Sequence, residues 1–124
     1  MTVEYLDLDG RERPYSQAVR AGSLVYTSGA AIGGPEDDIE VQTEKTIEYL
    51  AGILRHAGTD LQHVVKASVF LADLGEWARF NEVWKRHFPT NKPARTTTEV
   101  GHFNKHARIE IDFVAVVPGH ADRP

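Results

Sequence analysis

The pattern of hydrophobic and polar positions has a helical period in two parts of the chain. Over residues 39–57, apolar side chains recur at i, i+3, i+4 and i+7, and Gly58 follows where a C-terminal cap belongs. A second helix is predicted over residues 75–88, and Pro89 ends it. The apolar positions of the first helix are Ile47, Leu50, Ala51 and Leu54, and those of the second are Trp77, Phe80, Val83 and Trp84.

Shorter apolar and β-branched segments between turn residues predict strands. A further strand is expected to begin near Arg95, after the second helix. The element order β-β-β-α-β-α-β-β indicates an α+β domain in which both helices lie on one face of a mixed sheet. The other predicted strands span residues 3–8, 18–20, 23–28, 64–72 and 109–117.

Two of these strands carry apolar residues on both faces. In the last strand, residues 109, 111, 113, 115 and 117 form one apolar face, and residues 110, 112, 114 and 116 form a half-polar one. In strand 64–72, Val65, Ala67, Val69 and Leu71 are expected to oppose Val64, Lys66, Ser68, Phe70 and Ala72. Two helices can cover only one face of the sheet, so we expect self-association through the other.

Composition excludes several classes of function. The 124 residues suit one domain, with residues 117–124 as a loose tail. The absence of cysteine excludes disulfides, thiolate metal sites and a cysteine nucleophile. A net charge of −4 without a run of Lys or Arg argues against nucleic-acid binding, and no apolar run approaches the length of a membrane span. A cytoplasmic protein is the expectation.

Arg95 and Glu110 are the strongest candidates for chemistry. Arginine offers a planar fork that fits a carboxylate, although Arg95 could equally pair with Glu99 or another acid. Glu110 lies between two isoleucines, so its side chain should point away from the helices. There it is either an ordinary exposed glutamate or a carboxylate in a cleft that can transfer protons. Our hypothesis is that Arg95 holds a substrate carboxylate and Glu110 manages a water.

The remaining polar candidates are weaker alone, because each residue type is more often structural in its context. His102 and His106 are four residues apart, but in a loop with glycine and asparagine, where this spacing has no helical geometry. We therefore predict no metal site. Phosphate-binding glycine motifs and the GxSxG elbow do not occur. The supporting candidates for substrate binding are Tyr15, Ser28, Gly29, Asn81 and Thr97.

Several motifs together resemble the Rid/YjgF family of reactive-intermediate deaminases. The similarity extends in order from about residue 14 to residue 117. The motifs are Pro14-Tyr15-Ser16-Gln17, Ser28-Gly29, Gln42 sixteen residues before Gly58, VVKASVFLADL, FNEVW, PARTTTEV and RIEID.

The resemblance implies a chorismate-mutase-like (YjgF/L-PSP) fold and a homotrimer with a central barrel and active sites between subunits. It implies cofactor-independent hydrolysis of 2-imino acids, formed from enamines such as 2-aminoacrylate and 2-aminocrotonate, to 2-keto acids and ammonia. By position, Arg95 matches the carboxylate-binding arginine and Glu110 the glutamate that places the water. Tyr15 and Asn81 match cleft residues, while Gly29 and Thr97 fall where the carboxylate is held.

The sequence departs from the family pattern around the cleft, which leaves the substrate open. Ala30 replaces a common glutamine, Thr97 a common cysteine, and residues 102–104 replace a Leu-Pro step. One alternative is a deaminase of another acidic enamine, such as an aminomuconate-like or catabolic aminoacrylate compound. The other is a non-catalytic trimer that binds a small carboxylate for regulation.

Overall fold

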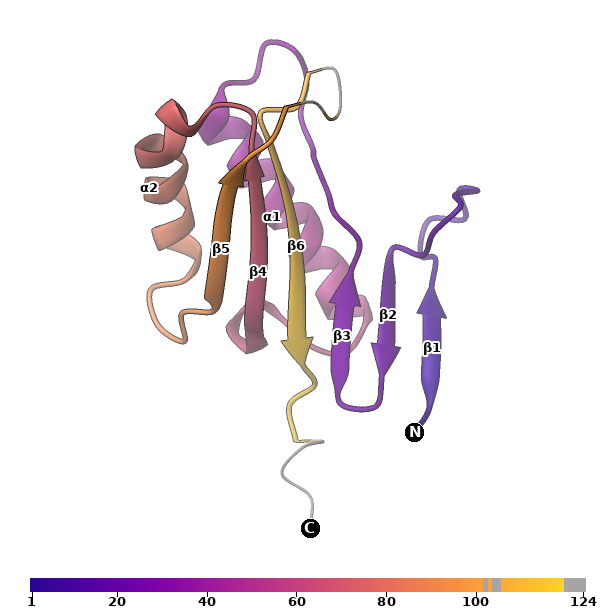
Figure 1. Ribbon diagram of the computed structural model, residues 1–124. Helices are drawn as coiled ribbons and strands as arrows, with labels where there is room; N and C mark the ends of the chain where they lie inside the picture. Colours follow the sequence, from indigo (N-terminus) through magenta and orange to yellow (C-terminus); the bar gives the residue numbers. More distant parts are fainter. Residues whose placement is uncertain (102, 104–105, 120–124) are drawn as a thin grey trace.

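Six strands form one mixed sheet in the computed structural model, which describes residues 1–101, 103 and 106–119 (Figure 1). Their order across the sheet is β1-β2-β3-β6-β4-β5, and β4 and β5 are parallel whereas the other neighbours are antiparallel. The last strand of the chain therefore lies inside the sheet. The strands are β1 (Val3–Leu6), β2 (Ala18–Ala21), β3 (Leu24–Thr27), β4 (Val64–Leu71), β5 (Ala94–Glu99) and β6 (Ile109–Val116).

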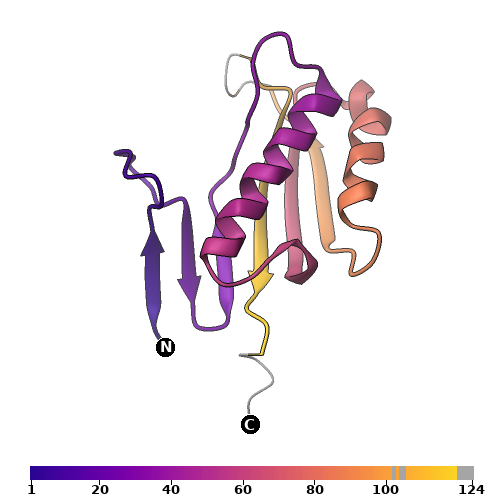
Figure 2. The same ribbon diagram turned by 180° about the vertical axis from the view of Figure 1, so that it is seen from behind.

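Two helices, α1 (Ile39–His56) and α2 (Trp77–His87), cover one face of this sheet. Figure 2, the view from behind, shows α1 crossing obliquely in front of the central strands and α2 lying beside β5, while β1 and β2 extend beyond the helices. Two 3-10 turns, η1 (Leu61–His63) and η2 (Leu74–Glu76), precede β4 and α2. The predicted α+β fold with both helices on one face is confirmed. None of the helices in the described part of the chain is long and apolar enough to cross a membrane.

Helix α1 has well-defined signals at both ends. The Asp38 side chain accepts a hydrogen bond from the Val41 N–H at 3.0 Å, which satisfies one of the free donors of the first turn. Gly58 adopts a φ of +95°, a conformation that glycine tolerates best. Its N–H donates to the Arg55 carbonyl, and the next N–H donates to the Leu54 carbonyl, which is the pattern of a Schellman cap. The predicted position of the cap is therefore confirmed.

Helix α2 begins two residues later than the sequence pattern predicts. Residues 74–76 form the 3-10 turn η2 instead, because the Asp73 side chain accepts the Gly75 N–H at 2.8 Å. Phe80, Val83 and Trp84 of the predicted apolar face are buried, whereas Trp77 is partly exposed, and Trp84 contacts Phe113 of β6 with ring centroids 6.1 Å apart. Aromatic packing thus fixes α2 against the middle of the sheet.

The predicted alternation of β4 is wrong at its first two residues. Val64 is buried and Val65 is 46% exposed, the reverse of the expectation. The cause is a bulge between Val64 and Lys66 in the pairing with β6, which inserts one residue and shifts the side chains before it to the other face. From Ala67 to Leu71 the predicted alternation holds.

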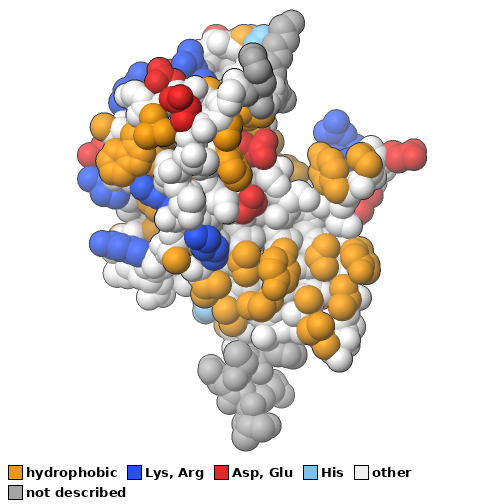
Figure 3. Space-filling view, viewed as in Figure 1, with side chains coloured by type: hydrophobic (Ala, Val, Ile, Leu, Met, Phe, Trp, Pro, Cys, Tyr) orange, Lys and Arg blue, Asp and Glu red, His pale blue; other side chains and the backbone are white. Residues whose placement is uncertain are grey.

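The sheet face opposite the helices, called here the bare face, is not covered by any helix or strand of the described residues and has two zones. Figure 3 shows hydrophobic side chains gathered over β1, β2, β3 and the nearby end of β6, with acidic side chains further along β6. Strand pairing accounts for the apolar zone, since Tyr5, Val19, Tyr26 and Val114 stand opposite one another in a row across four strands. Such a face is typical of an interface, and self-association through it stays a prediction.

Candidate functional site

Glu110 lies on the bare face of β6, opposite Phe70 of β4. The predicted direction of its side chain, away from the helices, is confirmed by the burial alternation of β6. Its carboxylate packs directly against the backbone of Gly29. A Cβ atom added at Gly29 would lie 2.5 Å from Glu110 Oε2, which is closer than real Cβ contacts come. Gly29 is therefore the residue that leaves room for this carboxylate.

A short backbone bridge fixes this arrangement. The Ala30 N–H donates to the Ile111 carbonyl at 2.8 Å, and the Ile111 N–H donates back to the Ala30 carbonyl at 3.0 Å. The bridge joins the residues that follow Gly29 and Glu110, so it holds the two next to each other. The position of Glu110 thus depends on main-chain hydrogen bonds as well as on its rotamer.

Tyr15 and Ser28 line one hollow with Glu110 and Gly29. Ser28 Oγ donates to the Ser16 carbonyl at 2.5 Å, and the Ser28 N–H donates to the Gln17 carbonyl at 3.0 Å. These bonds tie the Tyr15 segment to the end of β3. Because the Ser28 hydroxyl proton is already used, this side chain can offer a ligand only an acceptor.

Gln17 is a supporting residue to which the sequence analysis gave no role. It is buried, its Oε1 accepts the Leu8 N–H at 2.6 Å, and its Nε2 donates to Tyr49 Oη at 2.7 Å. It therefore links the N-terminal segment to α1. Its place in the Pro-Tyr-Ser-Gln motif was the signal that could have identified it.

The N-terminal segment 7–14, called here the arm, stands away from the sheet and bounds a hollow of about 390 Å³ that also contains Glu110 and Tyr15 (Figure 3). Arg13 holds the arm together, with its two terminal nitrogens 2.8 and 2.7 Å from the two oxygens of Asp9. The Arg13 guanidinium lowers the pKa of Asp9 well below its usual range, and the Arg11 N–H adds to this effect. The Arg11 side chain itself has no hydrogen bond or ion pair within the described residues and lines the same hollow.

Arg95 lies on the helix side of the edge strand β5 and points toward α2. Its Nη1 donates to Asn81 Oδ1 at 2.8 Å. No carboxylate of residues 1–101, 103 or 106–119 lies within ion-pair distance of it. The Glu99 carboxylate, the simplest alternative partner, accepts the Leu74 N–H at 2.8 Å instead. Partial burial lowers the pKa of Arg95, but a guanidinium stays charged at neutral pH.

Three aromatic rings surround the Arg95 guanidinium. Its central carbon is 4.9 Å from the Phe80 ring centroid, 5.1 Å from that of Trp84 and 5.8 Å from that of Trp77. These distances are within the range of cation–π attraction. With Asn81, these residues occupy i, i+3, i+4 and i+7 of α2, so one stripe of the helix faces the arginine. The sequence analysis assigned the aromatic positions to the core alone and missed this second role.

The two parts of the predicted site face opposite sides of the sheet. Arg95 pairs with Ala67 of β4, which faces the helices, whereas Glu110 pairs with Phe70, which faces away. Thr97, two residues after Arg95, lies on the same side as Arg95. The structure therefore groups Arg95 with Asn81 and Thr97, and groups Glu110 with the residues near Tyr15. A cleft that contains both groups requires a second copy of the chain, and it stays a prediction.

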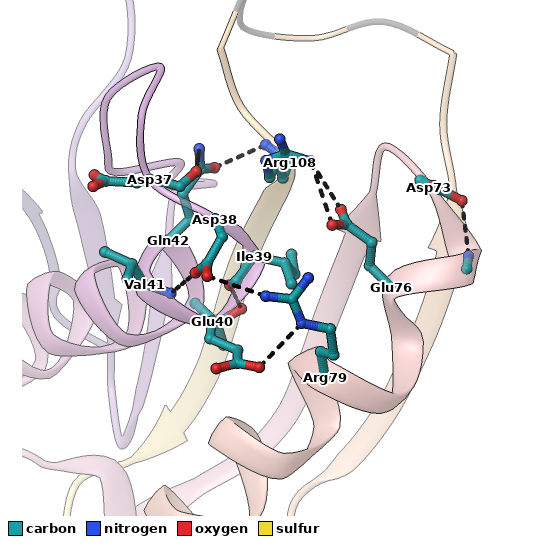
Figure 4. Close-up of polar contacts among 12 residues, drawn as sticks. Asp37, Asp38, Ile39, Glu40, Val41, Gln42, Asp73, Glu76, Arg79 and Arg108 are labelled. Atoms are coloured by element: carbon teal, nitrogen blue, oxygen red, sulfur yellow. Dashed lines mark hydrogen bonds and ion pairs between the residues drawn. The ribbon is translucent and has the colours of Figure 1, made fainter.

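A polar network holds the start of β6, two residues before Glu110 (Figure 4). The buried Gln42 accepts the Arg108 N–H at 2.8 Å and donates to the carbonyls of Asp37 and His106. The Arg108 side chain forms an ion pair with Glu76 at 3.3 Å. This network ties α1, η2 and β6 together. Of the loop considered in the sequence analysis, His102 and Asn104 lie outside the described residues, as do residues 120–124 of the predicted tail.

Comparisons with known proteins agree on one family. A family described as Endoribonuclease L-PSP matches residues 10–117. Protein DfrA of Myxococcus xanthus is 40% identical over 111 residues, covering 83% of this chain and 85% of that protein. Reactive Intermediate Deaminase A, chloroplastic, of Arabidopsis thaliana is 37% identical over 110 residues, covering 84% of this chain and 59% of that protein.

Solved structures extend the similarity to the fold. A member of the YjgF/YER057c/UK114 family from Mycobacterium tuberculosis superposes with a TM-score of 0.86 at 28% sequence identity. The superposition covers 94% of this chain and 100% of that chain. The architecture described above is therefore the YjgF/L-PSP fold.

Proposed function

The chain belongs to the Endoribonuclease L-PSP (Rid/YjgF) family, and on this basis we propose that it is a hydrolytic deaminase of reactive 2-imino acids. The substrates would be the imines that form from 2-aminoacrylate and 2-aminocrotonate. The products would be 2-keto acids and ammonia. The name of the Arabidopsis thaliana relative supports this class of reaction.

The observation that carries the proposal is the guanidinium of Arg95, which is partly buried and has no acidic partner within the described residues. A charge in this environment is costly unless something compensates for it. A substrate carboxylate would do so through two parallel hydrogen bonds. Asn81 holds one nitrogen of the fork at 2.8 Å, which leaves the other donors for a ligand.

Glu110 would supply the acid and base chemistry. An imine carbon is already electrophilic, so no covalent nucleophile is needed. The imine nitrogen would take a proton from solvent, and the Glu110 carboxylate would accept a proton from water as the water oxygen adds to the C=N carbon. In the resulting aminoalcohol, Glu110 would pass its proton to the nitrogen, the C–N bond would break to release ammonia, and the hydroxyl would lose its proton to solvent as the C=O bond forms. No metal or organic cofactor takes part in this scheme.

We propose that the complete site lies between two copies of the chain in a homotrimer. Arg95, Asn81 and Thr97 would come from one copy, and Glu110, Tyr15, Ser28 and Gly29 from the next. The bare, partly apolar sheet face supports this assembly, because it offers a large surface for self-association. A trimer closed by rotational symmetry would contain three equivalent sites.

The test is imine hydrolysis with matched variants. A serine or threonine dehydratase would generate the 2-imino acids in situ, and the disappearance of the imine would be followed with wild type, Arg95→Ala and Glu110→Gln. We expect wild type to accelerate hydrolysis and both variants to lose most of this acceleration. An Arg95→Ala protein as fast as wild type would contradict the proposal.

Binding separates a deaminase from a non-catalytic carboxylate-binding trimer. Both tryptophans of the chain lie within 6 Å of Arg95, so their fluorescence should report a carboxylate such as 2-oxobutanoate. Binding that depends on Arg95, without imine turnover and without an effect of Glu110→Gln, would identify the regulatory trimer.

RNA should be included as a substrate because of the family description, and the net charge of −4 argues against its cleavage.

A dicarboxylic enamine is the second candidate substrate, and Arg11 favours it. Its side chain lines the hollow of Glu110 and forms no ion pair with an acid of the described residues, whereas Asp9 is bound by Arg13. It could receive a second carboxylate at the far end of the substrate. An imine generated from aspartate by an amino-acid oxidase would then be hydrolysed faster than 2-iminopropanoate, and Arg11→Gln would abolish only this preference.

A further inference from the structure

We propose that Trp77 is a positioning residue of the carboxylate site, because its partly exposed indole orients the Arg95 guanidinium. This inference rests on the function proposed above, in which Arg95 binds the substrate carboxylate. It adds a residue that has no substrate contact of its own and that the family motifs quoted above do not include.

The first argument is the lack of other anchors on Arg95. Asn81 fixes one nitrogen of its guanidinium, and no acid of the described residues fixes another. A long side chain with one hydrogen bond can rotate about several bonds. The faces of three aromatic rings restrict it, since the negative face of each ring attracts the cation. The three rings therefore hold the guanidinium in place as an acidic partner would, but they leave its charge available to a ligand.

The second argument is the different burial of the three rings. Phe80 and Trp84 are almost completely buried and belong to the hydrophobic core. Trp77 is 40% exposed and stands outside this core, at the first residue of α2. The core residues therefore contribute mainly to folding, whereas Trp77 can be changed with little loss of packing. Its contribution to Arg95 can be measured separately for this reason.

The experiment compares two replacements that differ in one property. Trp77→Leu keeps an apolar side chain but removes the ring, and Trp77→Phe keeps a ring face. Leu74→Ala is the control, because Leu74 is 44% exposed near the same end of α2. Its backbone binds Glu99, which lies four residues along β5 from Arg95, a distance of roughly 13 Å. Calorimetry would give the Kd for 2-oxobutanoate, and steady-state kinetics would give KM and kcat for the imine.

We expect Trp77→Leu to raise Kd and KM about two- to fivefold, the factor that corresponds to one cation–π contact at a partly exposed position. The value of kcat should stay unchanged, because the reacting atoms keep their partners. Trp77→Phe should restore most of the affinity, and Leu74→Ala should behave as wild type.

Four results would overturn the inference. Trp77→Leu could bind and turn over as wild type does, Trp77→Phe could be as weak as Trp77→Leu, or Leu74→Ala could lose as much affinity. A fall in kcat with unchanged KM would also contradict it. If wild type itself neither binds the carboxylate nor hydrolyses the imine, the proposed function fails together with the inference. If wild type is active but replacement of Trp77 changes neither Kd nor KM, the inference fails and the proposed function stands.

Discussion

Replacement of Gly29 by alanine should move the Glu110 carboxylate without unfolding the protein. The new Cβ would stand 2.5 Å from Oε2 and 3.1 Å from the carboxyl carbon of Glu110. An ordinary contact begins at 3.4 Å, so Oε2 must retreat by about 0.9 Å. The atom in the way is the far end of a flexible side chain, which can rotate at a cost of roughly 1 kcal/mol or less.

The catalytic effect should be much larger than the effect on stability. A displacement of roughly 1 Å at a reacting group can reduce a rate by about 100-fold. We therefore expect Gly29→Ala to lower kcat by about 10- to 100-fold in the imine assay. The Kd for 2-oxobutanoate should change less, because Arg95 belongs to the other group of site residues. Thermal unfolding should show a melting temperature close to that of wild type.

Gly52→Ala is the matched control. Gly52 lies inside α1, and the nearest atom to an added Cβ is Arg55 Nη2 at 3.8 Å. The substitution should stabilise the helix by about 0.5–1 kcal/mol and leave the rate unchanged. Wild-type kcat in Gly29→Ala would refute the reasoning, because the close approach of Gly29 to Glu110 would then have no role in catalysis. A Gly29→Ala protein that is inactive only because it is unfolded would refute it as well.

Three further changes test the framework around the site. Asp38→Ala removes the side-chain acceptor of the Val41 N–H at the start of α1 and should cost about 1 kcal/mol in urea unfolding. Gln42→Leu removes the acceptor of the Arg108 N–H and should cost about 1–3 kcal/mol; unchanged unfolding would contradict the role of the network. Burial raises the pKa of Asp112, so the folded state binds its proton more readily than the unfolded state. Its contribution to stability must then decline as pH rises from about 4 through the folded pKa, and Asp112→Asn should remove that decline from melting curves measured between pH 4 and 7.

The sequence predicted those elements in which apolar residues keep a regular period. Helix α1 was predicted correctly because its apolar stripe is long and Gly58 marks its C-terminal end. The sequence did not predict which of the first residues of β4 are buried. The bulge after Val64 arises from the pairing with β6, and two adjacent valines give no sign of it. The late start of α2 depends on one hydrogen bond from Gly75 to Asp73, which the helical period could not indicate.

The side of the sheet that Arg95 faces could not be predicted either. Strand β5 reads Ala-Arg-Thr-Thr-Thr-Glu, in which three identical residues give no alternation of apolar and polar positions. Pairing with β4 decides the matter, and it places Arg95 opposite Ala67. For Glu110 the flanking isoleucines gave the answer, because both belong to the core. The candidate residues were therefore recognised individually, while their division into two groups required the structure.

The division of the candidate site between the two faces of one sheet has a genetic consequence in the proposed trimer. A chain without Arg95 would still supply an intact Glu110 to its neighbour, and a chain without Glu110 would supply an intact Arg95. Two alleles that are each inactive alone should therefore complement one another when expressed together, since some mixed trimers regain one site built from two undamaged halves. A cell that carries one such allele beside the wild type should lose one site for each damaged chain, because every chain supplies Arg95 to one site and Glu110 to another.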